Sequence, residues 1–587
     1  MAFRPPVRDL LFALNDILGV GQLAGTETFA EFDGDLAAAV LETAGALAGD
    51  VLAPLDQAGD RAGATFENGR VRAPAGFAEA YRAFAEGGWG ALAADPVYGG
   101  QGLPKTLELA VFEMVHAANM AFGLCPMLTS GAIEALHAHG SDRQKALYLP
   151  KMISGKWTGA MNLTEPQAGS DLSALTTRAE PDGHGGYRLH GQKIFITWGD
   201  HDLTENVVHL VLARLPDAPE GSRGISLFVT SKRLVAEDGA LGEANALRPG
   251  GIEHKLGIHG SPTCIMLFEG AHAELVGEPN RGLAHMFTMM NAARLNVGVE
   301  GVGVAERAYQ RALAYALERR QGRSPWSTDR SAAIFDHPDV RRMLADMRAR
   351  IEAARAICLL TALSADLARA APDEEARTAA KLREELLTPI AKAWSTDRAV
   401  EVASIALQVH GGAGFIEETG AAQSYRDARI APIYEGTNGI QAIDLVGRKL
   451  AMAGGEAFRT LLDEMAAFGQ SLIYSPNQTL DNIGLRLTGA VDGVRNFALL
   501  LDGASEPERL AAATPFLNQL GDVVGGWLLA RGAKACAGRA ETDAYARARI
   551  EIAAYYAETV MTRSVAVSSG AVDASKRLAG LDEAALS

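Results

Sequence analysis

The chain has 587 residues, of which 48% are hydrophobic and 21% are charged, and it carries a formal net charge of −16 at pH 7. That length predicts three or four domains, and the composition is typical of a globular protein with a sizeable core. The acidic balance disfavours nonspecific binding to nucleic acid or to an anionic membrane surface.

The N-terminus and the cysteines indicate where the protein works. The first residues, Met-Ala-Phe-Arg-Pro-Pro, lack the apolar stretch of a signal peptide. No apolar run reaches the ~18 residues that a membrane-spanning helix needs. The four cysteines lie far apart without a CxxC pair, which argues against a zinc site or a disulfide framework: Cys125, Cys264, Cys358 and Cys536. We therefore expect a cytoplasmic protein with no membrane span.

Residues 1–155 show the periodicity of helices. Leu10, Leu14 and Ile17 recur at intervals of four and three, and the alanine-rich stretch 36–52 favours a helix intrinsically. A loop rich in glycine and proline precedes a buried helix predicted over 107–120. These patterns predict an N-terminal α-helical domain over residues 1–155.

The sequence pattern changes near residue 156. Short runs rich in β-branched and aromatic residues, separated by glycines, predict strands over 187–197, 207–214, 224–230 and 263–268. The stretch 236–251 resembles a loop that leaves the sheet. We therefore predict a small antiparallel sheet or β-barrel domain over residues 156–280.

Helical periodicity returns at about residue 282 and continues to the end of the chain. It predicts long helices over 297–320, 339–367 and 384–411, the last of which ends in glycines. A boundary near 447–455 separates this domain, residues 281–450, from a helical extension over 451–587. The extension is predicted to hold helices over 456–470, 480–501, 506–537 and 542–568. The fold is therefore mainly α with an inserted β domain.

The stretch 433–441, Ile-Tyr-Glu-Gly-Thr-Asn-Gly-Ile-Gln, carries the most suggestive chemistry. It places the carboxylate of Glu435 on a turn, beside glycines that let backbone approach a ligand closely. A carboxylate at the edge of a helix suits a general base. A plain helix start is the alternative, with Thr437 or Asn438 as the N-cap and Glu435 near the positive end of the helix.

Two stretches of the β domain suit a flat, polar-edged ligand. The loop 163–171 combines proline and glycine with Thr164 and Ser170 and exposes backbone amides, although a surface turn capped by Asp171 is the alternative. In the strand 193–199, alternation places Phe195 and Thr197 on one face. An ordinary sheet face with one core aromatic remains the alternative there.

Two further stretches lie in the helical part. Residues 408–415, Gln-Val-His-Gly-Gly-Ala-Gly-Phe, hold three glycines in four positions, and a helix C-cap explains only one of them. The sequence Glu318-Arg319-Arg320 ends a helix, where most basic residues merely offset the helix dipole. Asn291 and Arg294 are a polar pair at the start of a largely apolar helix.

Together, these motifs resemble the flavin-dependent acyl-CoA dehydrogenases, in order and over roughly residues 30–450. The Thr-Glu-Pro-x-Ala-Gly-Ser-Asp loop, the strand containing Ile-Thr, Glu-Arg-Arg, Gly-Gly-x-Gly-Phe and Tyr-Glu-Gly-Thr are jointly specific. The resemblance implies an α-helical domain, a β-barrel and a four-helix bundle, here with a C-terminal helical extension. It also implies FAD between barrel and bundle, partly against a neighbouring subunit.

The resemblance also implies the roles of individual residues. Glu435 is the base that takes the α-proton of the acyl thioester, while flavin N5 takes the β-hydrogen as hydride. Some relatives carry the base just before the arginine that corresponds to Arg294, where this chain has Ala293. The implied FAD contacts are Met161, Leu163, Thr164, Ser170, Phe195, Thr197, Arg319, Gln408, Gly411, Gly412 and Thr437. The implied substrate contacts are Ser170, Asn291, Arg294, Tyr434 and Gly436.

Three positions depart from the family pattern. Gln321-Gly322-Arg323 follows the arginine pair where Thr-Phe-Gly is common, Gly439 stands where many members carry glutamine, and Asn291 replaces a common aspartate. These departures weaken the assignment of cofactor contacts near Arg319 and of one contact to the adenosine.

The expected reaction is the dehydrogenation of an acyl-CoA to a trans-2-enoyl-CoA, with electron-transferring flavoprotein as the acceptor and a homodimer or a dimer of dimers as the assembly. The extension narrows the resemblance to a bacterial branch that acts on 3-methylmercaptopropionyl-CoA in dimethylsulfoniopropionate breakdown. Broad-range short- and medium-chain fatty acyl-CoA dehydrogenases are the alternative. An acyl-CoA oxidase and a DNA-associated flavoprotein of the alkylation response are rivals, the latter disfavoured by the net charge of −16.

Overall fold

The computed structural model describes residues 3–578 and 580–587 and divides into two compact units. Unit 1 comprises residues 6–42 and 297–587, and unit 2 comprises residues 43–296 with a short N-terminal stretch. Helix α8 (Gly282–Glu318) supplies residues to both units.

Unit 2 contains a seven-stranded sheet of order β10-β11-β5-β4-β6-β3, in which β7 pairs with both β11 and β6. The pairings through β11, β5, β4, β6 and β7 therefore form a closed cycle, in which a single pair, Arg178 with Arg214, joins β4 to β6. Pairing on both sides protects the strands of this cycle, while β10 and β3 remain at the two ends of the strand order. The strands are β3 (Trp157–Asn162), β4 (Arg178–Pro181), β5 (Tyr187–Thr197), β6 (Asn206–Arg214), β7 (Ile225–Ser231), β10 (Leu247–Ile252) and β11 (Thr263–Val276).

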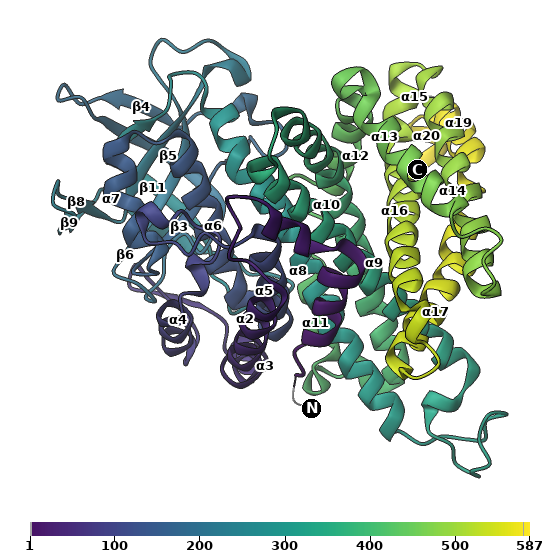
Figure 1. The fold of residues 1–587 in the computed structure, drawn as a ribbon. Helices are drawn as coiled ribbons and strands as arrows, with labels where there is room; N and C mark the ends of the chain where they lie inside the picture. The colour runs from purple at the N-terminus through teal and green to yellow at the C-terminus, as the bar shows by residue number, and fades with distance from the viewer. Residues whose placement is uncertain (1–2, 579) are drawn as a thin grey trace. The chain divides into compact units, whose positions relative to one another are not determined.

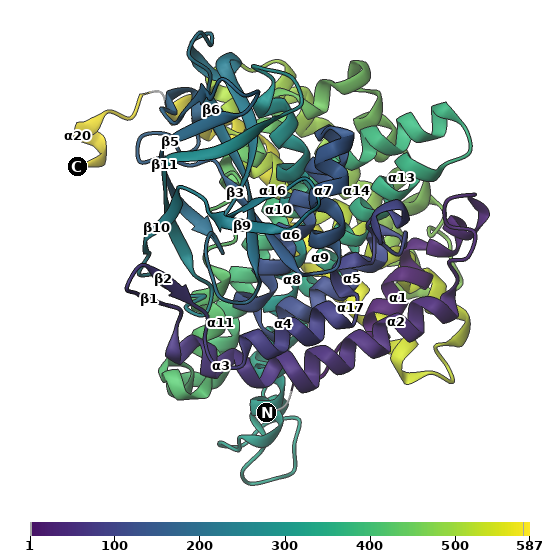
Figure 2. The same cartoon turned by 90° about the vertical axis from the view of Figure 1, so that its left-hand side faces the viewer.

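Two small hairpins accompany this sheet. Strands β1 (Thr65–Glu67) and β2 (Arg70–Arg72) lie beside β10 (Figure 2), and β8 (Arg233–Val235) pairs with β9 (Leu241–Ala244). The loop expected over 236–251 is therefore wrong where β9 and β10 form. Pro249 and two glycines hide the strand pattern there, and a register shift between Pro249 and Gly251 accommodates them.

Two helices of unit 2, α6 and α7, pack against strand β3 of the sheet. The helices of the unit are α3 (Ala53–Ala62), α4 (Phe77–Glu86), α5 (Lys105–Ala118), α6 (Met120–His139) and α7 (Asp142–Ile153), and α2 (Gly34–Ala46) enters the unit at its C-terminal end. The helix predicted over 107–120 corresponds to α5, which ends just before Asn119. Its extended backbone (φ −158°) stops α5, and its side chain accepts a hydrogen bond from the Phe122 N–H at 3.1 Å, which starts α6.

Unit 1 is helical, and its long helices α9, α10 and α16 pack against one another (Figure 1). Helix α10 begins at Glu374 rather than at 384, because Asp373 caps it by accepting from the Ala376 N–H at 2.7 Å. The extension belongs to this same compact unit. The helices are α1 (Val7–Phe12), α9 (Pro338–Ala370), α10 (Glu374–His410), α11 (Ala421–Ala428), α12 (Asn438–Gly447), α13 (Glu456–Gln470), α14 (Gln478–Asp502), α15 (Glu506–Ala511), α16 (Ala513–Cys536), α17 (Ala544–Tyr556), α18 (Thr562–Ser564), α19 (Val567–Leu578) and α20 (Glu583–Leu586). The prediction of a mainly α fold with an inserted β domain is confirmed.

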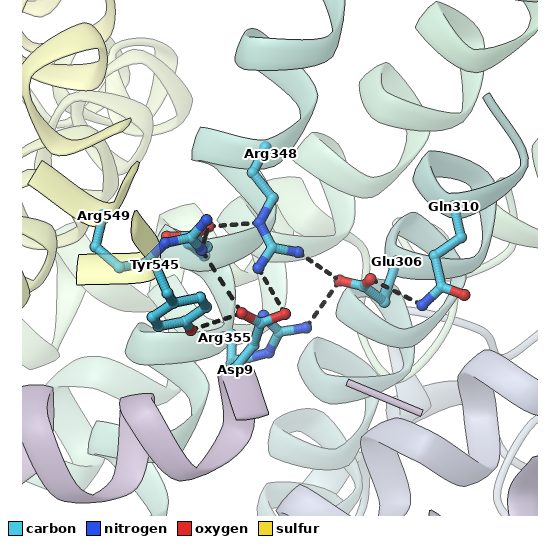
Figure 3. A network of polar contacts seen from close by, with 8 residues as sticks. Asp9, Glu306, Gln310, Arg348, Arg355, Tyr545 and Arg549 are labelled. Carbon is cyan, nitrogen blue, oxygen red and sulfur yellow. Dashed lines mark hydrogen bonds and ion pairs between the residues drawn. The ribbon is translucent and has the colours of Figure 1, made fainter. Parts of the chain in front are cut away.

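A buried network of charges joins four segments of unit 1 (Figure 3). Arg348 of α9 pairs with Asp9 of α1 at 2.6 Å and with Glu306 of α8 at 3.4 Å. Arg549 of α17 pairs with Glu352 of α9, so the extension takes part in the network. Burial would raise the pKa of the Asp9 carboxyl, but the surrounding arginines and Tyr545 hold it well below its usual range.

One helical run among the described residues, Gly34–Ala62, is long and apolar enough by length and composition to cross a membrane. The core helix of a soluble protein passes the same test. Acidic side chains recur along the run: Asp35, Glu42, Asp50, Asp56 and Asp60. Because each would be costly in the hydrocarbon core of a bilayer, the run is weak evidence for a span.

Candidate active site

The turn between α11 and α12 in unit 1 presents the carboxylate of Glu435. Glu435 has a φ of 56° and Gly436 a φ of 79°, so two successive residues adopt the left-handed conformation. A non-glycine residue in that region is strained, and such strain persists only where the surrounding structure holds it. The turn is therefore a site where backbone strain and a partly buried carboxylate coincide.

Helix α10 holds this turn in place through Lys392. Its ammonium donates to the Gly436 carbonyl and to Asn438 Oδ1, both at 2.9 Å, and the side chain is fully buried. The Asn438 amide donates to Ala393 O at 3.0 Å, and the Gln441 amide donates to the Glu435 carbonyl at 3.2 Å. Sequence reasoning missed Lys392, although a lysine within the apolar run 389–394 is a signal of a buried, paired charge.

The helix-start interpretation of the same turn is also correct for Thr437. Its hydroxyl oxygen accepts from the Ile440 N–H at 3.2 Å and begins α12. On the other side of Glu435, the Tyr434 hydroxyl donates to Oε2 of the buried Glu300 at 2.5 Å. One short turn therefore places Tyr434, Gly436 and Thr437 next to Glu435 in the chain.

The loop 163–171 and strand β5 come together in unit 2. The buried ammonium of Lys193 donates to the Leu163 carbonyl at 2.9 Å and to Glu165 Oε1 at 2.8 Å. The Ile194 N–H donates to the Thr164 carbonyl at 2.9 Å. Burial would raise the pKa of Glu165, but Lys193 and neighbouring hydrogen bonds lower it to about 2. Burial lowers the pKa of Lys193 to about 8, so both groups are ionised at pH 7. Met161, near the end of β3, is half-buried beside this loop.

Phe195 projects from a break in strand β5. Three residue steps on β5, from Lys193 to Ile196, oppose two on β11, which marks a β-bulge. Phe195 has a φ of 60° and is 58% exposed, an unusual position for a large aromatic side chain. Thr197 follows it, half-buried. The bulge interrupts the regular alternation expected for this strand and presents an aromatic face.

The remaining part of the loop is open. Ser170 is exposed, and a side chain at Gly169 would meet nothing within 4 Å. The Asp171 carboxylate accepts from the Ser173 N–H at 2.8 Å, so the capping interpretation of Asp171 is confirmed. Backbone amides of the loop are therefore accessible to a ligand.

Asn291 and Arg294 lie one turn apart on α8, in unit 2. An Arg294 guanidinium N–H donates to Asn291 Oδ1 at 3.2 Å, and Arg294 is buried. Ala293 between them is also buried and offers only a methyl group. The structure therefore brings the predicted polar pair together on one helix face.

Arg319 and the Gln408–Gly412 segment lie at the exposed ends of α8 and α10 in unit 1. A stacked contact between Tyr315 and His410, with ring centroids 4.6 Å apart, joins these two helix ends. Gly411 requires its φ of 58°, and a side chain at Gly414 would meet Leu407 O at 2.4 Å. Gly412 has neither constraint, and a side chain there would meet nothing within 4 Å.

The Lys193–Glu165 pair yields a prediction. Lys193→Met leaves the buried Glu165 carboxylate without its cation, which we expect to lower the free energy of unfolding by about 3–5 kcal/mol. The loop 163–171 should also become disordered, and the content per chain of the FAD that the sequence resemblance implies should fall. Thermal unfolding and the flavin absorbance of the purified protein measure both effects.

The double variant Lys193→Met/Glu165→Gln is the matched control, because it leaves no unpaired charge. It should recover part of the stability that the single variant loses. A single variant with wild-type thermal stability would contradict this account of the loop.

Four family models match the chain in order. They are the acyl-CoA dehydrogenase N-terminal domain over residues 37–156, the middle domain over 160–271, the C-terminal domain over 280–451 and the acetyl-CoA dehydrogenase C-terminal-like domain over 461–582. The matches therefore continue into the extension.

Known proteins match over nearly the whole chain. The 3-methylmercaptopropionyl-CoA dehydrogenase of Ruegeria pomeroyi is 47% identical over 584 residues, covering 98% of each chain. A broad-specificity linear acyl-CoA dehydrogenase of Mycobacterium tuberculosis is 33% identical, covering 95% of each. The structure of an acyl-CoA dehydrogenase of Bacillus anthracis complexed with FAD shares the fold with a TM-score of 0.75 at 20% identity, covering 96% of this chain and 92% of that one.

Proposed function

The chain belongs to the acyl-CoA dehydrogenase family, and we propose that its substrate is 3-methylmercaptopropionyl-CoA, which it converts to methylthioacryloyl-CoA. Family membership makes it an FAD-dependent enzyme that introduces a double bond between Cα and Cβ of an acyl-CoA. The substrate proposal rests on the 47% identity to the Ruegeria pomeroyi enzyme, which extends through the C-terminal extension. It places the reaction in dimethylsulfoniopropionate breakdown.

A broad-range fatty acyl-CoA dehydrogenase of β-oxidation is the second candidate. The linear acyl-CoA dehydrogenase of Mycobacterium tuberculosis also matches over 95% of the chain, at 33% identity. Both candidates use the same reaction and the same base, so they differ only in the acyl group that the pocket accepts.

The residues of unit 2 fit a flavin. The exposed face of Phe195 suits packing against a flat ring, and Thr164 and Thr197 lie on the two segments that Lys193 and Ile194 tie together. Open backbone at Gly169 and Ser170 suits a phosphate or the pantetheine of CoA. In unit 1, Arg319 and Gln408–Gly412 would hold the pyrophosphate and adenine. FAD, when bound, supplies the acceptor for the β-hydrogen and its electron pair.

Glu435 is the proposed base for the α-proton of the thioester. A free carboxylate is too weak a base for this proton, so the site must also stabilise negative charge on the thioester oxygen. The main-chain N–H of Glu435 is the donor that the chain itself would supply. Lys392, Asn438 and Gln441 fix this backbone, so the donor needs no rearrangement during the reaction. Asn291, Arg294, Tyr434 and Gly436 would contact the acyl-CoA.

The assembly and the acceptor are also proposals. Exposed apolar side chains at Leu317, Phe415 and Ile416 support burial of the α8 and α10 ends against a second copy in a homodimer or a dimer of dimers. Electron-transferring flavoprotein is the proposed acceptor, and the cytoplasm the proposed location. We also propose the four-domain division at residues 155, 280 and 450.

An anaerobic titration tests the proposal. The purified protein should be yellow, and 3-methylmercaptopropionyl-CoA should bleach its flavin faster than butyryl-CoA or octanoyl-CoA does, because the pocket would match the short thioether chain. Stopped-flow absorbance across these thioesters gives the ranking.

Faster bleaching by the octanoyl thioester would favour the broad-range candidate. An oxidised spectrum that persists with every thioester would reject the dehydrogenase. Rapid reoxidation of the reduced flavin by oxygen, with peroxide formed, would identify an oxidase instead.

A further inference from the structure

We propose that Glu300 is a positioning residue of the active site, which holds the turn of the base through Tyr434 and does so as an uncharged carboxylic acid. The proposal rests on Glu435 being the base. Glu300 belongs to none of the motifs that the sequence singles out, and it lies on α8 seven residues after Ala293. Seven residues are two helical turns, so Glu300 follows Ala293 along one face of α8.

Glu300 is buried against the turn that carries Glu435. Its side chain is fully buried, and Oε2 accepts the hydrogen bond from the Tyr434 hydroxyl at 2.5 Å. Within the described part of the chain, Oε1 has no hydrogen-bond partner. An ionised carboxylate with one unsatisfied oxygen is very costly in such a place, whereas a neutral acid is much less so.

The two residues that flank Glu435 are each tied to a different helix. Tyr434 is tied to α8 by Glu300, and Gly436 is tied to α10 by Lys392. Glu435 itself has the strained φ of 56°. Because strain persists only where the surroundings hold it, both ties are needed to keep the carboxylate in one orientation.

The close approach of α8 to α10 places Glu300 in this position. A side chain at Gly298 would meet Ala391 O at 2.5 Å, and one at Gly301 would meet Thr396 Cα at 3.3 Å. Glycines at both positions let the two helices pack tightly on either side of Glu300. The carboxyl group of Glu300 is therefore buried in the region where α8 and α10 approach closely.

The charged and titratable groups around Glu300 come from three other segments. They are Tyr434 and Glu435 on the turn, Lys392 on α10 and Asp427 on α11. Burial, together with the two carboxylates, raises the pKa of Glu300 to about 8, against the lowering effects of Tyr434 and Lys392. At pH 7 the site therefore holds one neutral acid, Glu300, beside the base. Two neighbouring carboxyl groups can have different roles when their environments shift their pKa values apart in this way.

Ionisation of Glu300 should impair the enzyme. The carboxylates of Glu300 and Glu435 would then compete for Lys392, which otherwise holds the Gly436 carbonyl. The added negative charge of Glu300 would also oppose the negative charge that develops on the thioester oxygen. We therefore expect kcat/KM to fall as pH rises through about 8.

The first experiment compares three variants of the holoenzyme by their pH profiles. Glu300→Ala should lower kcat at pH 7 about 10-fold or more, because it releases one side of the turn, with little change in KM. Glu300→Gln keeps a neutral hydrogen-bond acceptor, so its kcat at pH 7 should be close to that of the wild type. Its kcat/KM should no longer fall above pH 8. Tyr434→Phe removes a bond that lowers the pKa of Glu300, so it should shift the fall to higher pH.

A second experiment follows the ionisation without using activity. A carboxyl group whose pKa rises from about 4.5 in the unfolded chain to about 8 in the folded one destabilises the fold progressively between these values. The unfolding equilibrium constant of the wild type, relative to Glu300→Gln, should therefore rise about tenfold per pH unit from roughly pH 5 to 8 and be constant above.

The outcomes separate this inference from the proposed function. A ratio of unfolding constants that does not change with pH, or a Glu300→Gln enzyme that keeps the fall above pH 8, would overturn the role of Glu300. Failure of every acyl-CoA to bleach the wild-type flavin would instead overturn the proposed function, while the unfolding experiment would still report on Glu300.

Discussion

Glu435→Gln is expected to lower turnover by roughly 10³-fold or more while the protein keeps its FAD. Glutamine has the shape of glutamate but cannot accept the α-proton, and the buried Ala293 cannot replace it. The turn should persist in the variant, because Lys392 and Gln441 hold its main-chain carbonyls. Steady-state kinetics and flavin absorbance measure the two properties separately.

Glu456→Gln is a matched control, since Glu456 is an exposed glutamate in the first turn of the neighbouring helix α13. It should retain wild-type kcat and KM. Near-normal turnover in Glu435→Gln would mean that another group removes the proton. Loss of FAD together with activity would mean that the carboxylate supports the fold of the site rather than the chemistry.

Arg348→Met is expected to lower the free energy of unfolding of unit 1 by about 3–5 kcal/mol. Arg348 is buried and pairs with Asp9, Glu306 and Glu352, from three different helices (Figure 3). Its removal leaves three buried carboxylates with too few cations. Methionine preserves most of the volume, so the loss reports charge rather than a cavity.

Arg342→Met, on the same helix, is the control. Arg342 and its partner Asp339 are both more than half exposed, and an exposed pair of this kind contributes about 0–1 kcal/mol. Thermal unfolding of both variants at the same pH and salt concentration gives the comparison. Equal melting temperatures in the two variants would show that the buried network does not hold the extension to the bundle.

Much of the fold could be predicted because local patterns determine it. The periodicity over 339–367 and 456–470 corresponds closely to α9 and α13. Predictions failed where a polar side chain or a bulge decides the boundary. Asn119 ends α5 two residues before the predicted boundary and begins α6, which was not predicted as a separate helix, and the bulge beside Pro249 makes a strand of an expected loop.

The residues of the candidate site could likewise be predicted from the sequence only in part. The sequence alone indicated Glu435 and Phe195, because a carboxylate among glycines and an aromatic residue near a threonine are local sequence patterns. Neither Lys392 nor Glu300 was found, since each acts through a contact with Gly436 or Tyr434, far away in the sequence. The left-handed backbone of Phe195 and Glu435 is likewise visible only in three dimensions.

The order of the motifs along the chain was enough to identify the family and the reaction class, because residues that touch a cofactor or substrate must keep their chemical identity and spacing. The buried charges that hold those residues became visible in the packed structure alone. A lysine or glutamate is tolerable in a core solely when a distant group satisfies it, and that pairing depends on how helices such as α8 and α10 pack rather than on any local pattern.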